Sequence, residues 1–135
     1  ALPISRIIDM ATLTGAVIIA LGSVRAALYS NNEKLAKLCE HAGELTGERV
    51  WRMPLDEDYM SLMKSDIADL RNSGKKRAAG SVTAAIFLQE FIENKTPWIH
   101  LDIAGTAFLD SPEHYHLTQA TGAGVRLVIT LIENL

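Results

Sequence analysis

The sequence contains one cysteine, Cys39, and has neither a CxxC motif nor a cysteine and histidine pattern typical of a metal site. A single cysteine cannot form an internal disulfide, which indicates a reducing compartment, and we expect the protein in the cytoplasm. Basic residues are not in excess either, since the formal net charge is -3. The positive field with which proteins attract nucleic acid is therefore missing, and we predict no nucleic-acid partner.

Long hydrophobic runs are also absent. The most apolar segment, residues 11–21, is too short to span a membrane, so we predict no membrane partner. Asp9 lies just before it, where a signal peptide would have basic residues. We interpret this segment as part of a hydrophobic core.

The remaining composition is typical of a folded domain. The chain has 135 residues, of which 48% are hydrophobic and 21% charged, and this is enough for one domain with a sizeable core. Neither internal repeats nor low-complexity linkers interrupt it. No start methionine precedes the first apolar run, so we expect the chain to begin within a larger protein.

Hydrophobic runs and helical spacing alternate along the chain. Apolar and β-branched runs predict strands at residues 4–10, 26–30, 50–55 and 98–103. Apolar residues at helical spacing predict helices at residues 33–45, 81–94 and 123–135. Strands separated by helices favour an α/β fold, here a partial three-layer α/β/α domain with a largely parallel sheet flanked by helices.

Polar residues mark the ends of these elements. Asn31 and Asn32 provide N-cap oxygens for the helix that starts at residue 33, and Gly47 supplies its stop. Asp56 can cap a further helix that carries Tyr59 and the apolar residues after it. The polar segment that follows is predicted to be a loop.

In folds of this class, ligands bind beyond the carboxyl ends of the strands, where side chains and free backbone groups converge. Two loops have that position: residues 11–15 follow the first strand, and residues 105–108 follow the strand WIHLDI. Both consist largely of small residues, which allow a ligand to approach the backbone closely. The sequence therefore indicates a ligand site at these loops, without naming a reaction.

Polar residues near these loops admit more than one interpretation. His100 and Asp102 alternate along one strand, so both side chains lie on one face and can act as a base and its orienting acid. Because no partnered nucleophile is identifiable, a structural pair that supports the strand end is favoured. Asp9 can be a metal ligand, but one carboxylate without companions favours local hydrogen bonding. Thr12 and Thr14 can satisfy the backbone of the turn.

Charged and histidine-containing loops are the other candidate sites. Lys75, Lys76 and Arg77 can clamp an anion, although a solvated loop is the commoner case. His114 and His116, in PEHYH, have the spacing of a metal site, but their loop has little to fix the geometry. The segment TLTGAVIIALG lacks the lysine of the phosphate-binding GxxxxGK(S/T) motif, which disfavours a nucleotide site.

Several segments resemble those of a known family. DMATLTGA at residues 9–16 and HLDIAGTA at residues 100–107 resemble signature segments of the cytosolic leucyl aminopeptidase family. VWRMPL, ADLRNSG and AAGSVTAAIFLQEF match in order between them, and ATGAGVRLVITLIENL resembles the C-terminal helix of that family. Family members are dinuclear metal exopeptidases that remove N-terminal amino acids from peptides, with a preference for leucine. The resemblance covers essentially the whole chain.

The resemblance also implies what lies outside this sequence. In the family, an NTDAEGR motif with an upstream lysine and aspartates binds two divalent metals, and a second lysine and the motif's arginine assist the chemistry. No NTDAEGR occurs here. We therefore expect residues 1–135 to be the C-terminal portion of the catalytic domain, with no catalytic residue and no metal ion bound by this chain alone. The resemblance implies manganese, zinc or magnesium in the complete enzyme, which would be a hexamer.

By the same resemblance, three residues contact the backbone of the substrate, the N-terminus of a peptide. The Thr12 carbonyl would accept a hydrogen bond from the free amino group or the first residue, and the Leu13 N–H would hold an oxygen of the gem-diolate. A backbone donor fixed at a strand end needs no reorganisation as charge develops. Gly15 would allow the substrate backbone to approach closely.

Three more residues are assigned by resemblance to the pocket for the first side chain. Ala104 and Ala107 would line this pocket, and Ser73 would lie on its rim. Their small size leaves volume for a leucine side chain, whose burial is worth about 2 kcal/mol. Some family members have bulkier apolar residues at the Ser73 and Ala107 positions, so the preference among side chains stays open.

Two hypotheses for the whole chain follow. In the first, it is part of a leucyl aminopeptidase and is active only together with its N-terminal complement. In the second, it is a non-catalytic binding or assembly module derived from the same fold. An upstream reading frame that encodes NTDAEGR would favour the first hypothesis, and a start codon near Ala1 would favour the second.

Overall fold

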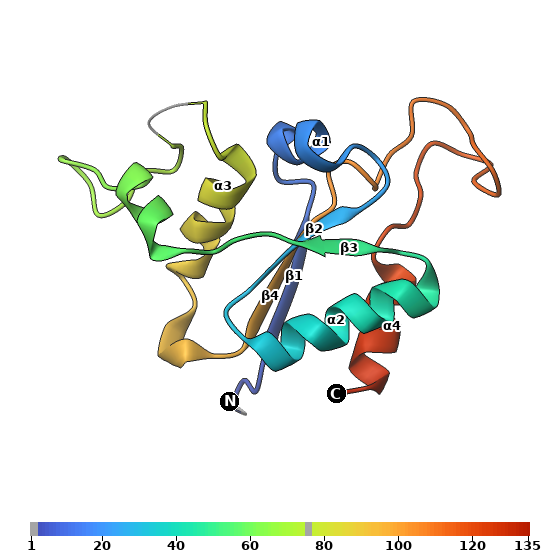
Figure 1. The fold of residues 1–135 in the computed structure, drawn as a ribbon, viewed down its shortest axis with the longest axis horizontal. Coiled ribbons are helices and arrows are strands. Elements are labelled where there is room, and N and C mark those ends of the chain that lie inside the picture. Colours follow the sequence, from blue (N-terminus) through green and yellow to red (C-terminus); the bar gives the residue numbers. More distant parts are fainter. Residues whose placement is uncertain (1–2, 75–76) are drawn as a thin grey trace.

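A mixed sheet with helices on both sides forms the framework of the protein (Figure 1). The computed structural model describes residues 3–74 and 77–135, in which the sheet has four strands in the order β1-β4-β2-β3. The strands are β1 (Ile7–Ala11), β2 (Ala26–Ser30), β3 (Val50–Arg52) and β4 (Trp98–Asp102). The helices are α1 (Gly15–Leu21), α2 (Glu33–Thr46), α3 (Gly80–Gln89) and α4 (Val125–Glu133), with the short 3-10 helices η1 (Glu57–Leu62) and η2 (Glu93–Lys95).

The directions of the strands bring two distant chain segments together. β1 pairs with β4 in parallel, with Ala11 opposite Asp102, and β2 pairs with β3 in parallel. The central pair of β2 and β4 is antiparallel, so the sheet is mixed, although most of its pairings have the predicted direction. Because β1 and β4 are parallel, their carboxyl ends lie at the same edge of the sheet, and the loops after them start side by side.

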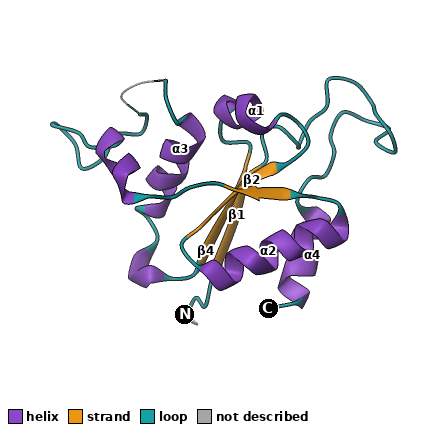
Figure 2. Cartoon of the chain, in the orientation of Figure 1, coloured by secondary structure: helices purple, strands orange, loops and turns teal. Residues whose placement is uncertain are grey.

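Helices cover both faces of the sheet, which confirms the predicted three-layer arrangement. On one face, Leu28 of β2 and Leu101 of β4 belong to a core shared with α2 and α4. On the other face, Tyr29 of β2 and Trp98 of β4 belong to a core shared with α1 and α3. Figure 2 shows α2 beside α4, with α1 and α3 on the other side. One strand supports both layers, because its successive side chains point to opposite faces.

The apolar segment 11–21 contains a helix, α1, that its sequence did not predict. Thr14 is the N-cap of this helix, and its side chain accepts a hydrogen bond from Val17 N at 3.2 Å. Val17 is buried, whereas Ile19 is 90% exposed. The interpretation of the whole segment as core is therefore wrong, because a helix packed on a sheet buries only one stripe of its surface. Neither α1 nor any other described helix has the length and apolarity that a membrane crossing needs.

The other elements follow the prediction with shifted ends. Asn32 caps α2 by accepting a hydrogen bond from Leu35 N at 2.9 Å, and Gly47 ends that helix with a φ of 74°. The predicted helix after Asp56 is the 3-10 helix η1, and the Asp56 side chain makes no cap hydrogen bond. Helix α3 ends at Gln89, earlier than predicted, and β3 is shorter than the predicted strand.

Candidate functional site

The loops after β1 and β4 meet at the shared edge of the sheet. The Ile103 N–H donates to the Ala11 carbonyl at 2.9 Å, which continues the contact between the two strands by one residue. The first loop then leads into α1, and the second turns back on itself, because Ala107 N donates to the Ile103 carbonyl at 2.9 Å. The two stretches that the sequence indicated as a ligand site are therefore neighbours.

Asp102, the last residue of β4, joins these two loops. Its Oδ1 accepts hydrogen bonds from the backbone N–H groups of Leu13, Thr14 and Ala104 at 3.1, 3.4 and 3.2 Å. Its Oδ2 accepts from Thr14 Oγ1 at 2.7 Å. Burying a carboxylate is costly unless donors surround it, and the loops supply these donors. The Leu13 N–H, which the resemblance assigns to a gem-diolate oxygen, thus has a protein acceptor in this structure.

Two hydroxyl groups extend this network from the sheet edge to α3. The Tyr29 hydroxyl donates to Ser81 Oγ at 2.8 Å, and Ser81 Oγ donates to Asp102 Oδ2 at 3.3 Å. Burial raises the pKa of Tyr29 to about 12; the hydrogen bond to Ser81 opposes this rise and the charge of Asp102 adds to it. The hydroxyl therefore stays protonated at neutral pH and acts as a hydrogen-bond donor. The sequence alone gave no signal for Tyr29 or Ser81.

Asp9 and His100 form a second polar pair, on neighbouring strands. His100 Nδ1 lies 2.6 Å from Asp9 Oδ1, and Trp98 Nε1 donates to Asp9 Oδ2 at 2.6 Å. The His100 ring is fully buried and stacks with the rings of Tyr29 and Trp98. The local hydrogen-bonding role favoured for Asp9 is confirmed. His100 and Asp102 do share a face, as predicted, but the acid that holds His100 is Asp9.

A cavity of about 690 Å³ opens beside these loops. Leu13 and Ser73, two of the predicted substrate-binding residues, line it together with Arg77 and the adjacent side of α3. Lys75 and Lys76, the other two cations of the predicted anion clamp, lie outside the described residues. The structure thus places the loop after β1, the segment around Ser73 and α3 around one volume.

Four of the predicted substrate-binding residues are not among the described residues that line this cavity, although they lie at the same edge of the sheet. They are Thr12, Gly15, Ala104 and Ala107. Thr12 is exposed, and within residues 3–74 and 77–135 no hydrogen-bond donor reaches its carbonyl oxygen. Apart from its chain neighbours and the nearby backbone of α1, no atom lies within 4 Å of the position that a Cβ atom on Gly15 would take. Ala104 packs against the core that the sheet shares with α1 and α3.

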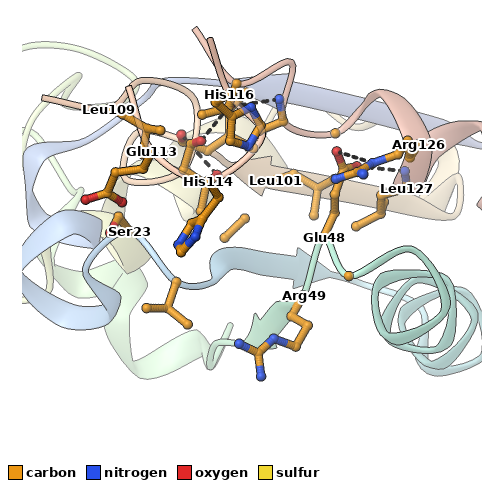
Figure 3. Close-up of a pocket in the computed structure, with 18 of the residues that line it drawn as sticks. Ser23, Glu48, Arg49, Leu101, Leu109, Glu113, His114, His116, Arg126 and Leu127 are labelled. Atoms are coloured by element: carbon orange, nitrogen blue, oxygen red, sulfur yellow. Dashed lines mark hydrogen bonds and ion pairs between the residues drawn. The ribbon is translucent and has the colours of Figure 1, made fainter. Parts of the chain in front are cut away.

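A second cavity, of about 350 Å³, lies under the loop that carries His114 and His116 (Figure 3). The His116 ring packs against Tyr115, with 4.2 Å between the ring centroids, whereas His114 extends on the Ser23 side of the cavity. In the part of the chain that the structure describes, no group of three or more His, Cys, Asp or Glu side chains could hold a metal ion. The described residues therefore do not fit the two-metal site that the resemblance implies for the complete enzyme.

These features define an α/β domain in which the loops at the carboxyl ends of two parallel strands meet, and the first of these loops lines the cavity that is the candidate ligand site. Comparison with known proteins gives its family. The family model described as the catalytic domain of the cytosol aminopeptidase family matches residues 2–129. The chain belongs to this family, which confirms the resemblance seen in its sequence.

Relatives named probable cytosol aminopeptidase match almost the whole chain. The protein from Cenarchaeum symbiosum is 54% identical over 127 residues, covering 92% of this chain and 26% of the relative. The protein from Chlorobium phaeobacteroides is 57% identical over 127 residues, covering 94% of this chain and 25% of the relative. A solved structure of a mutant of tomato leucine aminopeptidase matches with a TM-score of 0.88 and 40% identity, covering 97% of this chain and 25% of that one. The chain thus spans about a quarter of the length of these proteins.

Proposed function

We propose that this chain forms the substrate-binding part of an aminopeptidase that hydrolyses N-terminal amino acids, leucine among them, from peptides. The complete enzyme would bind two divalent metal ions, manganese, zinc or magnesium, which activate water and polarise the scissile carbonyl. The residues that hold these ions, and the catalytic lysine and arginine, would belong to the part of the relatives that this chain does not cover. Residues 1–135 would then be the C-terminal portion of the catalytic domain.

The observation that carries this proposal is the cavity between the loop after β1, the segment around Ser73 and α3, in a chain of the cytosol aminopeptidase family. The cavity has a volume of about 690 Å³, so a leucine-sized side chain has room, and its burial is worth about 2 kcal/mol. In this proposal the side chain lies between Leu13 and Ser73, which line the cavity, and Ala104 and Ala107, which lie outside its lining at the same edge of the sheet. Binding energy from the first residue then holds the peptide in place for hydrolysis.

The peptide's amino group would be recognised by backbone atoms of the loop after β1. The Thr12 carbonyl is a free acceptor among the described residues, and an ammonium group carries donors that suit it. Gly15 would allow the peptide backbone to pass close to the start of α1, where no protein atom occupies the space of a Cβ. The loop thus selects for a free N-terminus.

Location and assembly belong to the same proposal. We place the protein in the cytoplasm, and the name cytosol aminopeptidase that its relatives carry supports this location. A homo-oligomer, a hexamer by family resemblance, would cover apolar side chains that are almost fully exposed in this chain. Examples are Ile19 and Leu117, each 90% exposed, and Ile67, which is 98% exposed.

Replacing Gly15 with alanine tests the place of the substrate backbone. In the longer polypeptide that contains this chain, we expect Gly15→Ala to keep or slightly raise stability, because the Cβ meets no protein atom and alanine favours a helix. If the peptide passes here, kcat/KM for leucine p-nitroanilide falls by about tenfold or more through steric overlap. An unchanged kcat/KM would remove Gly15 from the site.

Ala107→Trp tests the pocket for the first side chain. An indole group at this position should exclude a leucine side chain and lower kcat/KM for leucyl substrates by at least about tenfold. Alanyl substrates, which need less room, should lose much less. The matched control is Ala20→Trp, at an exposed position of α1, for which we expect no loss. Equal kcat/KM of Ala107→Trp and wild type for leucyl substrates would place the pocket elsewhere.

A further inference from the structure

The Asp102 carboxylate accepts hydrogen bonds from five donors, of which three are backbone N–H groups of the loops after β1 and β4, the proposed substrate-binding loops. The residue is only 1% exposed. None of the ion pairs within the described residues includes it, so these hydrogen bonds are what stabilises its negative charge. A buried anion held in this way fixes the direction of every group that donates to it.

The bond from Leu13 N–H to Asp102 also determines where the preceding carbonyl points. In a planar trans peptide, the C=O and N–H groups point in opposite directions. Because Leu13 N lies 3.1 Å from Asp102 Oδ1, the Thr12 carbonyl oxygen points away from Asp102. Thr12 is exposed and its carbonyl oxygen is free of donors from residues 3–74 and 77–135. Asp102 thus holds a free acceptor in one direction at the surface of the site.

We infer that Asp102 is a positioning residue that aims the Thr12 carbonyl at the amino group of the bound peptide, without touching the peptide itself. The inference rests on the proposed function, because the amino group is that of an aminopeptidase substrate. A carboxylate suits this task, since one oxygen holds the amides of Leu13 and Thr14 while the other accepts from two hydroxyls. The Leu13 N–H is engaged before substrate binds, so any contact with a gem-diolate oxygen shares that donor.

Asp102→Asn in the longer polypeptide tests the inference. The amide is uncharged and replaces the acceptor Oδ2 by an NH2 donor, so the bonds from the backbone N–H groups to Oδ1 weaken and the Thr14 and Ser81 hydroxyls lose their acceptor. In this inference the amino group makes the same contact in the ground state and in the transition state. Losing that contact therefore weakens substrate binding and raises KM. We expect KM for leucine p-nitroanilide to rise about tenfold while kcat stays within about twofold.

Two competitive inhibitors separate positioning from a general structural role. Isoamylamine carries the leucine side chain and an amino group, and 4-methylpentanamide carries the side chain without the amine. We expect Asp102→Asn to raise the inhibition constant of isoamylamine by the same factor as KM and to leave that of 4-methylpentanamide unchanged. The matched control is Asn32→Ala, which removes the cap of α2 far from the site and should leave both inhibition constants unchanged.

Each outcome decides the matter. A folded Asp102→Asn enzyme with unchanged KM, or with both inhibitors weakened equally, overturns the inference while the proposed function stands. If Asp102→Asn does not fold, Thr14→Val removes the 2.7 Å contact with Asp102 together with the cap bond from Val17 N, and Thr14→Ser keeps both. The inhibition constant of isoamylamine should rise about threefold in Thr14→Val and return to the wild-type value in Thr14→Ser. Equal inhibition constants of isoamylamine in Thr14→Val and Thr14→Ser overturn the inference. A wild-type polypeptide without hydrolysis refutes the proposed function and this inference together.

Discussion

Tyr29 and Cys39 are ionisable side chains that the fold keeps in their neutral forms. Burial raises the pKa of each to about 12, and the negative charge of Glu40 adds to the rise for Cys39. The protonated Tyr29 hydroxyl supplies the donor that reaches Ser81, so the hydrogen-bond network around Asp102 depends on it. The protonated thiol lies in the core between the sheet and α2, where a thiolate would be desolvated.

These two raised pKa values predict a loss of stability at alkaline pH. In the unfolded chain both groups lose their protons at lower pH, because the pKa is about 8.5 for a free thiol and about 10 for a free phenol. Their contribution is therefore complete below these values and is lost as the pH rises toward 12. We expect the free energy of unfolding, measured by urea titration, to fall by up to about 1.4 kcal/mol per pH unit for each group.

Cys39→Ala is the matched variant for this experiment. Without the thiol, the free energy of unfolding should stay nearly flat between about pH 8.5 and 9.5, below the range in which a phenol titrates. At higher pH, the fall caused by Tyr29 should remain. The same slope in Cys39→Ala and wild type over that lower range would show that the thiol titrates equally in the folded and unfolded states.

Single residues also show what the sequence could and could not predict about the site. The local role of Asp9 was predictable, because one carboxylate beside a strand has few other partners. Asp102 was predictable only as a neighbour of His100, since both lie on one face of β4. Its actual partners, Leu13 and Ser81, are 89 and 21 residues away in the chain, and only the fold brings them together.

At the scale of elements, the loop after β4 is pinned against the end of α1. Gly105 is buried, and a Cβ atom at its position would overlap the carbonyl oxygen of Gly22, the C-cap of α1. That oxygen belongs to the backbone and cannot move away as a flexible side chain could. The close approach holds the two loops of the candidate site in one arrangement.

Gly105→Ala should therefore destabilise the protein by about 2 kcal/mol or more, because the backbone of one loop has to shift. Gly15→Ala is the control within the same site, since its Cβ meets no atom within 4 Å and should be neutral or slightly stabilising. Thermal unfolding followed by circular dichroism compares the two variants. Equal melting temperatures would mean that the contact between Gly105 and Gly22 is not tight.

The elements themselves were predictable to the extent that local signals determine them. Helix α2 has an asparagine cap and a glycine stop, and it begins and ends close to its predicted bounds. Helix α1 was missed because its apolar residues surround the helix axis, so the segment lacks the stripe that marks an amphipathic helix. The antiparallel pairing of β2 and β4 was also missed, since strand direction depends on contacts such as Ala27 with Asp102 that no local pattern encodes.

For the whole molecule, the proposed function makes this chain one side of a site whose metal ions and catalytic residues would belong to the rest of the protein. It covers about a quarter of its relatives, and within the described residues β1 is an edge strand that pairs with β4 alone. An edge strand presents free backbone N–H and C=O groups to any neighbouring chain. Further strands of a complete catalytic domain would pair with this edge and bring their own groups to the loop after β1.

The central claim is that this chain binds substrate while the rest of the protein holds the metal ions. Its most direct test is the hydrolysis of leucine p-nitroanilide by two purified proteins, the isolated 135-residue chain and the longer polypeptide that contains it. Each is assayed with added Mn²⁺ and again after treatment with a chelator. We predict metal-dependent turnover by the longer polypeptide and none above background by the isolated chain, whose described residues include the proposed substrate-binding loops but no group of three or more His, Cys, Asp or Glu side chains that could hold a metal ion. Metal-dependent turnover by the isolated chain, or none by the longer polypeptide, would contradict this prediction.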